Sequence, residues 1–324
     1  MLSGSKKCNI CPRECQLQEN QLGFCKVRKN VKGKIISTVY GYTTGLAVDP
    51  IEKKPLYHFY PKSSVLSFGT FGCNMGCIFC QNHYMSKHEQ DFSLSKKVMP
   101  ESVVETALYY GCKSVAFTYN DPVVFLEYAK DTAKLCREHG LKTVAVTAGY
   151  MNNPENFYYL IDAANIDLKG FSEDFYKRNC LAKLAPVLET IKYVANYTDC
   201  VLELTTLLIE GENDDYSVLK NEFEWILENI GDKIPLHLSA FHPDFKMLNR
   251  QRTSVDKLLK ARNLAKSIGL KNVYCGNIIE IDSSSTICPN CGEIVIKRKG
   301  YETFDEKIKD GCCQTCGEKI YGEF

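Results

Sequence analysis

The stretch FGTFGCNMGCIFCQNHY, from Phe68 to Tyr84, places three cysteines within eight residues, at Cys73, Cys77 and Cys80. Their spacing is C-x3-C-x2-C, and no fourth cysteine follows nearby. A structural zinc site is usually closed by four protein ligands. Three thiolates with one open position instead favour a 4Fe-4S cluster that keeps one iron free for an exogenous ligand.

Two other interpretations of this loop stay open. The thiols could be reduced and metal-free, or they could hold zinc with a distant fourth ligand such as His83. Two observations favour the cluster over both. Gly72 and Gly76 let the backbone wrap closely around a bulky group, and the loop directly follows a predicted strand.

On both sides of this loop, β-branched runs alternate with helical patterns. The expected strands cover residues 64–70, 114–120, 143–149, 164–170, 201–209, 235–241 and 271–277. Their near-continuous apolar character is typical of parallel strands covered by helices. Helical periodicity separates the strands, for example over 121–140, where Asp121 has the position of an N-cap and Gly140 that of a C-terminal stop.

Six or seven such units predict an α/β fold whose strands form a barrel or part of one. The alternative, a doubly wound sheet, normally carries a glycine-rich phosphate loop after its first strand. In GTFGCNMGC the glycines frame cysteines instead. We therefore expect a barrel over residues 64–285, an N-terminal cysteine module with a β-rich extension over 1–63, and a small C-terminal cysteine module over 286–324.

Composition narrows the function classes. The 324 residues include 40 basic and 39 acidic side chains, so the net charge of +1 gives no global electrostatic argument for a nucleic-acid partner. No run approaches about eighteen apolar residues, and the N-terminus has no apolar signal region. We therefore expect a cytoplasmic protein with no membrane partner. In that reducing compartment, the 17 cysteines indicate metal binding and not disulfides.

Two C-x2-C-G knuckles, separated by 21 residues, stand near the C-terminus. They supply Cys288, Cys291, Cys313 and Cys316. Four thiolates form a closed site for zinc, or for iron as in rubredoxin. We favour zinc in a structural or docking role, which leaves Cys312 as a spare thiol.

A second group of four cysteines stands near the N-terminus, at Cys8, Cys11, Cys15 and Cys25. Zinc and an auxiliary iron–sulfur cluster are about equally compatible with four thiolates. Unmetallated thiols are less attractive, because clustered cytoplasmic cysteines are prone to oxidation. The isolated cysteines, expected to be small buried hydrophobes, are Cys112, Cys136, Cys180, Cys200 and Cys275.

The segment CNMGCIFC resembles the C-x3-C-x-Φ-C signature of the radical S-adenosylmethionine (SAM) superfamily, with Phe79 as the aromatic Φ. Longer segments look like those of the AmmeMemoRadiSam-system radical SAM enzymes, which are relatives of pyruvate formate-lyase activating enzyme. Among these segments are AFTYNDPVVFLEYAKDTAKLCREHGLKTVAVTAGYM, NIDLKGFSEDFYKR, PLHLSAFHPDFKM and CPNCGEIVIKRKGY. The resemblance spans nearly the whole chain.

This resemblance implies a partial (β/α)6 barrel of the TIM type, with Cys73, Cys77 and Cys80 as ligands of the 4Fe-4S cluster. It implies that SAM chelates the open iron through its amino and carboxylate groups. An electron from a ferredoxin or flavodoxin would cleave the sulfonium C–S bond, giving methionine and a 5′-deoxyadenosyl radical that abstracts hydrogen from a substrate. The protein would supply orientation and the exclusion of water and oxygen.

The resemblance also places SAM-binding residues at the ends of later strands. Asn120 and Asp121 stand where wider relatives carry a Gly-Gly-Glu-type motif for the methionine amino group, although Asp121 could simply cap the next helix. Lys169 is implied to contact SAM, and Asp167 to lie near a monovalent-cation site with Thr147. Alternation places Asp167 and Lys169 on one face of their strand, where a plain ion pair is the alternative.

Two further strand ends complete the expected site. Thr205 and Thr206 on the fifth strand could meet ribose or methionine oxygens, and Ile209 could lie under the adenine. His242 follows the sixth strand, where the family pattern puts a histidine near SAM.

The substrate stays open at this stage. The direct analogy is a glycyl-radical activase that acts on a protein partner, and radical modification of a tRNA or of a small molecule is the alternative. A function of another class is a zinc-binding adaptor or RNA-binding module in which every cysteine group is structural. The sequence does not indicate the oligomeric state.

Overall fold

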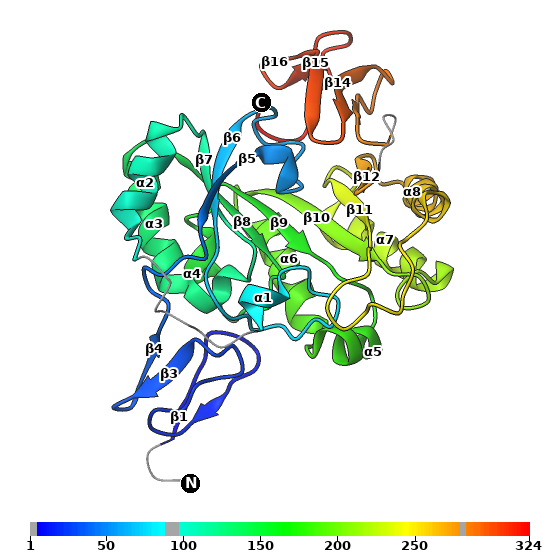
Figure 1. The fold of residues 1–324 in the computed structure, drawn as a ribbon. Coiled ribbons are helices and arrows are strands. Elements are labelled where there is room, and N and C mark those ends of the chain that lie inside the picture. The colour runs from blue at the N-terminus through cyan, green and yellow to red at the C-terminus, as the bar shows by residue number, and fades with distance from the viewer. Residues whose placement is uncertain (1–4, 88–96, 279–282) are drawn as a thin grey trace.

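The computed structural model describes residues 5–87, 97–278 and 283–324. Its centre is an eight-stranded sheet in the order β12-β11-β10-β9-β8-β7-β6-β5 (Figure 1). The strands from β6 to β12 all pair in parallel. They are β6 Ser64–Phe68, β7 Ser114–Phe117, β8 Lys142–Thr147, β9 Ala163–Asp167, β10 Val201–Leu208, β11 Leu236–Ala240 and β12 Val273–Gly276. Each of the seven predicted strands is confirmed.

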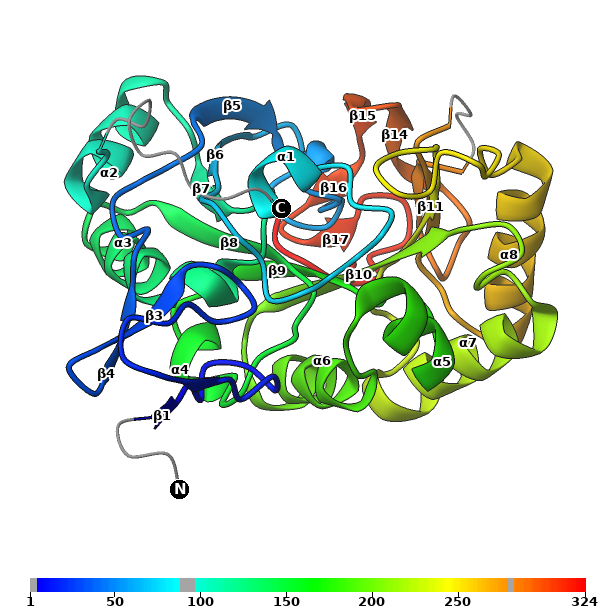
Figure 2. The same cartoon turned by 60° about the horizontal axis from the view of Figure 1, so that its bottom comes forward.

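Helices cover the outer side of this curved sheet (Figure 2). The longer ones are α2 Pro100–Tyr109, α3 Leu126–Glu138, α6 Ala185–Tyr197, α7 Tyr216–Ile230 and α8 Val255–Ile268, and the short ones are α1 His83–Ser86, α4 Glu155–Tyr158 and α5 Glu173–Phe175. The predicted cap at Asp121 is confirmed, since its carboxylate accepts a hydrogen bond from the backbone N–H of Val123 at 3.1 Å. Gly231 ends α7 with φ +95°, which favours glycine.

The sheet is an open barrel. In the described residues its order ends at β5 and β12, which do not pair with each other, so the predicted partial barrel is confirmed. The outer strand β5 (Leu46–Pro50) runs antiparallel to β6, with Leu46 opposite Phe68. This strand comes from the segment that we assigned to the N-terminal extension, so the extension supplies one strand of the main sheet.

A buried carboxylate organises the end of the barrel where the strands begin. Glu203, on β10, is fully buried, and its Oε1 accepts hydrogen bonds from the backbone N–H groups of Tyr57 (2.8 Å) and His58 (2.7 Å). Its Oε2 lies 2.6 Å from Nε2 of His237 on β11. His58 in turn contacts the Tyr274 hydroxyl at 2.6 Å. These bonds hold the 57–58 segment across this end of the barrel.

The C-terminal module packs against the same end (Figure 1). Its strands are β13 Thr286–Ile287, β14 Ile294–Lys299, β15 Glu302–Glu306, β16 Ile308–Lys309 and β17 Cys312–Cys313. Arg298 is fully buried and donates to the Tyr57 carbonyl at 2.6 Å. The final residues of the chain also contact this end of the barrel, where the Tyr321 carbonyl oxygen lies 2.6 Å from Nδ1 of His58.

The N-terminal module lies at the opposite end of the barrel in Figure 1. It contains two hairpins, one of β1 Lys6–Lys7 with β2 Gln16–Leu17 and one of β3 Arg28–Val31 with β4 Lys34–Ser37. Arg28 anchors it, since this buried side chain pairs with Glu127 on α3 at 2.6 Å. Within the described part of the chain, no helix is long and apolar enough to cross a membrane.

Candidate metal centre and cofactor site

The three-cysteine loop leaves the carboxyl end of β6 and is held on several sides. Gly72 has φ +77°, and a Cβ there would approach the Cys25 carbonyl oxygen to 2.2 Å, so only glycine fits. The Gly76 N–H donates to the Cys180 carbonyl at 2.8 Å, and the Ile78 N–H donates to the Asn179 carbonyl at 2.9 Å. The loop therefore keeps its shape through backbone bonds to distant segments.

The loop thiols have different surroundings. Burial raises the pKa of Cys73 to about 12, so deprotonation there needs a nearby cation. A hydrogen bond from the Cys180 thiol lowers the pKa of Cys77, against the effect of burial, and the Lys169 ammonium acts in the same direction. The Cys80 sulfur lies 3.3 Å from the Ser86 hydroxyl. The surroundings of Cys77 therefore favour its thiolate form more than those of Cys73 do.

Asn120, predicted as a SAM ligand, holds the start of this loop. Its Oδ1 accepts from the Thr70 N–H at 2.9 Å, and its Nδ2 donates to the Gly72 carbonyl at 2.8 Å. The side chain is 5% exposed. These bonds engage both ends of the amide, so the structure gives Asn120 a positioning role for the loop.

Asp121 and Thr147 are brought together at the ends of β7 and β8. The Thr147 hydroxyl donates to Asp121 Oδ1 at 3.0 Å, and the backbone N–H of Ala148 donates to Oδ2 at 2.9 Å. Burial raises the pKa of Asp121, although these donors and the cap oppose the change. The capping role is therefore confirmed, and the carboxylate also ties two strand ends together beside the loop.

Asp167 and Lys169 share one face, as predicted. Lys169 Nζ lies 2.8 Å from Asp167 Oδ2. Burial alone would lower the pKa of Lys169, but the neighbouring Asp167 and Cys77 raise it well above its usual value. Since the same Lys169 charge acts on Cys77, this ion pair faces the three-cysteine loop and is more than a remote structural contact.

Thr205 and Thr206 separate to the two faces of β10. Thr205 lies on the same face as Glu203, inside the barrel, opposite Asp167 on β9 in the strand register. Its hydroxyl is buried and has no hydrogen-bond partner among the described residues. Thr206 donates instead to Glu222 on α7 at 2.5 Å, so the expectation that it faces SAM is wrong, because strand alternation turns it toward the helix layer.

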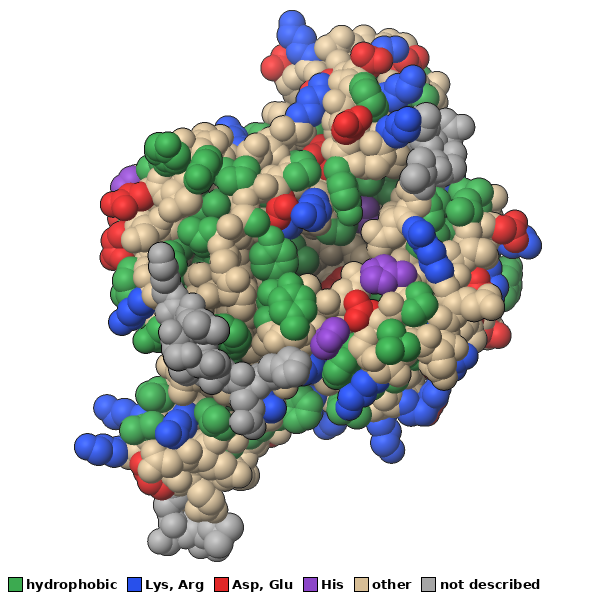
Figure 3. Space-filling view, in the orientation of Figure 1, with side chains coloured by type: hydrophobic (Ala, Val, Ile, Leu, Met, Phe, Trp, Pro, Cys, Tyr) green, Lys and Arg blue, Asp and Glu red, His purple; other side chains and the backbone are tan. Residues whose placement is uncertain are grey.

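The remaining predicted residues differ in exposure. Phe79 is 4% exposed and packs against Phe175, with ring centroids 6.1 Å apart. Ile209 is fully buried. His242 is exposed in the segment after β11. Figure 3 shows a hollow in the middle of this face with histidine and acidic side chains at its edge.

The predicted C-terminal quartet forms a compact group. The sulfur atoms of Cys288 and Cys316 lie 3.5 Å apart, and those of Cys291 and Cys313 lie 3.8 Å apart. All four lie within 4.8 Å of one another. Tetrahedral coordination by four thiolates at about 2.3 Å from one ion produces sulfur separations of this size.

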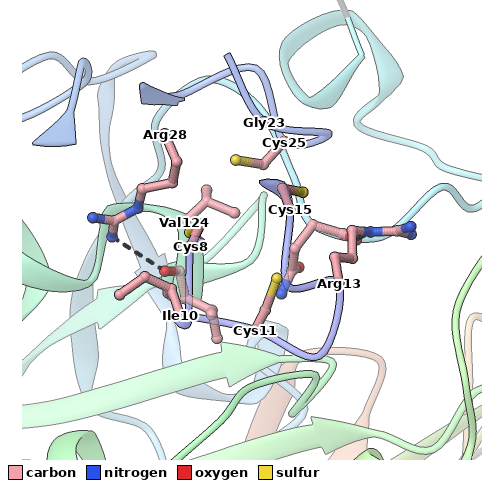
Figure 4. A pocket seen from close by; sticks show the side chains of 11 residues that line it. Cys8, Ile10, Cys11, Arg13, Cys15, Gly23, Cys25, Arg28 and Val124 are labelled. Carbon is pink, nitrogen blue, oxygen red and sulfur yellow. Dashed lines mark hydrogen bonds between the residues drawn. The ribbon is translucent and has the colours of Figure 1, made fainter. Parts of the chain in front are cut away.

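The N-terminal quartet lines one small, largely enclosed pocket, where Figure 4 shows its four side chains around a common space. Burial raises the pKa of Cys11 to about 12, and it also raises the pKa of Cys8 and of Cys25. Among the described residues, the C-terminal quartet is the only group of three or more Asp, Glu, His or Cys side chains whose ligand atoms all lie within 4.8 Å of one another. The monovalent-cation site near Asp167 and Thr147 therefore stays a prediction.

These side chains fit a cluster with one open iron and a SAM molecule beside it. Three thiols stand at one strand end, and Lys169 supplies a buried positive charge for a carboxylate. Thr205 supplies an unpartnered hydroxyl in the same interior. An unpartnered buried hydroxyl is costly unless a ligand satisfies it. The arrangement can thus bind and orient a polar cofactor next to a metal cluster.

Sequence reasoning missed Cys180, which we expected to be a lone buried hydrophobe. Cys180 is buried, yet its thiol donates a hydrogen bond to the sulfur of Cys77. No local pattern marks it, since the five-residue π-helical segment Tyr176–Cys180 brings it to the loop only in the folded chain. Asn74 was missed for the same reason, although it donates to the Tyr150 carbonyl at 2.6 Å.

Comparisons with known proteins identify the family and the fold to which the chain is similar. A family model described as the Radical SAM superfamily matches residues 68–220. The chain is 40% identical over 316 residues to an uncharacterized protein, MJ0808, of Methanocaldococcus jannaschii, which covers 97% of this chain and 94% of that protein. It is 28% identical over 109 residues to the pyruvate formate-lyase-activating enzyme of Clostridium pasteurianum, covering 33% of this chain and 46% of that enzyme.

A solved structure extends the likeness in fold. The crystal structure of a radical SAM methyltransferase from Sphaerobacter thermophilus aligns with a TM-score of 0.53 and 14% sequence identity. The alignment covers 72% of this chain and 71% of the methyltransferase. The shared part is the fold of the partial barrel.

Proposed function

Because the chain belongs to the radical SAM superfamily, we propose that it cleaves SAM reductively at a 4Fe-4S cluster and abstracts hydrogen from a substrate. Cys73, Cys77 and Cys80 would hold the cluster. When bound, the cluster and SAM supply one-electron chemistry: one electron splits the sulfonium C–S bond into methionine and a 5′-deoxyadenosyl radical. A ferredoxin or flavodoxin would deliver that electron.

One observation carries this proposal. The loop that carries three cysteine thiols lies beside the Lys169–Asp167 pair, at the carboxyl end of a parallel barrel, and it would leave one metal position open. Catalytic groups of such barrels gather at this end, because the loops that follow the strands meet there. A structural metal site would need a fourth protein ligand. The compact C-terminal quartet has this arrangement of four cysteines in the same chain.

The chain's own residues would bind and orient SAM in distinct ways. Lys169 would pair with the methionine carboxylate, and Thr205 would donate its free hydroxyl to a SAM oxygen. Asp121 would meet the methionine amino group at the edge of the loop, while Asn120 keeps the loop in place. His242 and Phe79 stay weaker candidates, since one is exposed and the other packs in the core.

The C-terminal quartet would hold zinc. Its sulfur separations fit one tetrahedral ion, and its place at the far end of the barrel keeps it out of the reaction. Cys291 and Cys316 are exposed, which suits a docking surface as well as a structural site.

The substrate we propose is a macromolecular partner, in the manner of a glycyl-radical activase. The similarity to a pyruvate formate-lyase-activating enzyme over a third of the chain supports this choice. A hydrogen atom would pass from the partner to the 5′-deoxyadenosyl radical, leaving 5′-deoxyadenosine and a radical on the partner. Tritium or deuterium transfer into 5′-deoxyadenosine from candidate partners would identify the donor.

The test of the cleavage step is anaerobic incubation of the reconstituted protein with SAM and dithionite. We expect 5′-deoxyadenosine from the wild type and none from Cys77→Ala. Cys112→Ser is the matched control, because this isolated buried cysteine lies just before β7 and belongs to none of the three cysteine groups. Failure of the wild type to produce 5′-deoxyadenosine after full iron loading would contradict the proposal and favour a zinc-binding adaptor.

A further inference from the structure

The N-terminal quartet of Cys8, Cys11, Cys15 and Cys25 has no part in the SAM site described above. Its four side chains nevertheless surround one pocket, and they come from two turns of the N-terminal module (Figure 4). The Cys8 N–H donates to the Cys15 carbonyl at 2.9 Å, which closes the first turn. Four thiols gathered this way in a reducing compartment indicate a bound metal group.

Backbone N–H groups donate hydrogen bonds to the sulfur atoms of this quartet. The N–H groups of Ile10 and Arg13 donate to the sulfurs of Cys8 and Cys11. The N–H groups of Val27 and Arg28 both donate to the sulfur of Cys25. The C-terminal quartet uses the same device, for example from Glu293 to Cys291. Such donors stabilise the thiolate form, which is the form that binds metals.

The spacing of the sulfurs separates the two quartets. The C-terminal sulfurs lie within 4.8 Å of one another, whereas no three of the N-terminal sulfurs do. One tetrahedral ion needs the closer spacing, because each thiolate lies only about 2.3 Å from it. A cluster of several irons and sulfides holds its thiolates farther apart. The N-terminal arrangement is therefore compatible with an iron–sulfur cluster and differs from the C-terminal one.

One buried arginine puts a positive charge beside the pocket. Arg28 is 2% exposed, its charge acts on Cys8 and Cys25, and its Nε–H has no hydrogen-bond partner among the described residues. Arg13 lines the pocket through its stem and donates to the Asn74 carbonyl of the three-cysteine loop. An iron–sulfur cluster with four thiolates carries net negative charge, which the buried Arg28 guanidinium stabilises.

The pocket shares a wall with the SAM site. Asn74, the neighbour of Cys73, lines it, as do Val123 and Val124 from the segment after Asp121. On the other side, the Cys25 carbonyl fills the space where Gly72 would carry a Cβ. A group bound by Cys25 and a group bound by Cys73 would thus be separated by a single layer of backbone.

We propose that Cys8, Cys11, Cys15 and Cys25 hold a second iron–sulfur cluster that passes single electrons to the cluster on the three-cysteine loop. A low-potential one-electron donor protein reduces the second cluster by one electron. That electron moves to the loop cluster, so the second cluster returns to its oxidised state, and no bond forms or breaks in the quartet. The direction of transfer rests on the proposed function, whereas the identity of the bound group does not.

The first experiment identifies the group without any enzymatic activity. The full-length chain carrying Cys73→Ala, Cys77→Ala and Cys80→Ala is reconstituted anaerobically with iron and sulfide and then reduced. We expect about four irons per chain and an electron paramagnetic resonance signal that SAM does not change. Zinc alone, or loss of all iron, in this variant would overturn the proposal.

The reciprocal variant tests the relay. With Cys11→Ser and Cys15→Ser, we expect 5′-deoxyadenosine formation with dithionite to persist, since this small reductant reaches the loop cluster directly. With a flavodoxin as donor, formation should fall by about tenfold or more relative to the wild type. An equal loss of 5′-deoxyadenosine formation with both reductants would contradict a relay. If circular dichroism shows that this variant is misfolded, the triple loop variant decides which group the quartet binds.

If the wild type fails to cleave SAM with either reductant, the proposed function fails but the second cluster does not. Its signal in the triple loop variant would still be present. The two failures are therefore distinguishable.

Discussion

The C-terminal quartet and the three-cysteine loop use cysteine in opposite ways. The quartet brings four sulfurs within 4.8 Å at the end of the barrel where strands begin, in a module anchored by Arg298 and the chain terminus. The loop brings three thiols to the other end, beside Lys169, whose partner Asp167 lies opposite Thr205 in the strand register. A closed ligand set stabilises a fold, and an open one leaves a metal position for chemistry.

The largest expected effect separates these two designs directly. Cys77→Ala removes a ligand from an already incomplete set, so we expect 5′-deoxyadenosine formation to fall by at least about a thousandfold. Cys313→Ala removes a ligand from the closed set and should lower the melting temperature while the loop still binds iron. Iron and zinc analysis of both variants, together with product assays, checks this. If Cys313→Ala removed the loop iron as well, the two sites would not be independent.

Acid should loosen the C-terminal end of the molecule. Complete burial lowers the pKa of His58 to about 4, although the nearby Glu203 carboxylate opposes the shift. The unfolded chain therefore binds a proton more readily than the folded chain, and stability is lost as the pH falls from about 6.5 toward 4. This loss amounts to roughly 3 kcal/mol for a shift of this size.

Urea unfolding between pH 7 and pH 4, followed by fluorescence, measures this loss. A His58→Gln variant should show a flatter profile over the same range, since glutamine does not titrate. An identical slope in both proteins would exclude His58 as its source.

Lys169 tests the open site. Lys169→Ala removes one of the two lysine charges, with Lys87, that act on the loop cysteine Cys77, and we expect the dissociation constant for SAM to rise by about thirtyfold. Lys142→Ala is the control, because this lysine pairs with Asp162 and Glu323 away from the loop. Isothermal titration with SAM under anaerobic conditions gives both constants. Equal affinities for the two variants would remove Lys169 from the SAM site.

Thr205 and Thr206 offer the smallest and most discriminating comparison. Thr205→Val deletes a hydroxyl with no partner in the described structure, so we expect SAM affinity to fall by about fivefold with little loss of stability. Thr206→Val should leave SAM affinity unchanged but destabilise the fold, because the buried Glu222 loses its hydrogen-bond donor. A reversed pattern in binding and denaturation experiments would contradict our assignment of the two faces of β10.

Much of this fold was predictable, for identifiable reasons. The seven parallel strands follow from buried apolar runs separated by capped helices, and the Asp167–Lys169 pair follows from strand alternation. Strand alternation also predicts that Thr205 and Thr206 lie on opposite faces of β10. It identifies the one that faces the barrel interior only when the inward face of the strand is known. Glu203 identifies that face, because a charged residue in an apolar strand is expected to point toward a buried hydrogen-bond partner, and Thr205 lies two residues further on the same face.

Other features depend on contacts between distant segments. Cys180 reaches Cys77 through a turn more than ninety residues along the chain, and the sequence around it has no pattern that indicates this. Asn120 was expected to bind SAM because it stands where wider relatives carry a Gly-Gly-Glu-type motif, and the structure shows its amide hydrogen-bonded to the backbone of Thr70 and Gly72. The pairing of β5 with β6 could not be predicted either, since an edge strand leaves only a short apolar signal.

The most direct test of the central claim is pulsed electron paramagnetic resonance of the reduced protein with SAM labelled by nitrogen-15 at its amino group. We expect a hyperfine coupling between this nitrogen and the reduced cluster in the wild type, and its absence in Cys77→Ala. If the spectrum of the reduced loop cluster were the same with and without SAM, SAM would not bind at the open position.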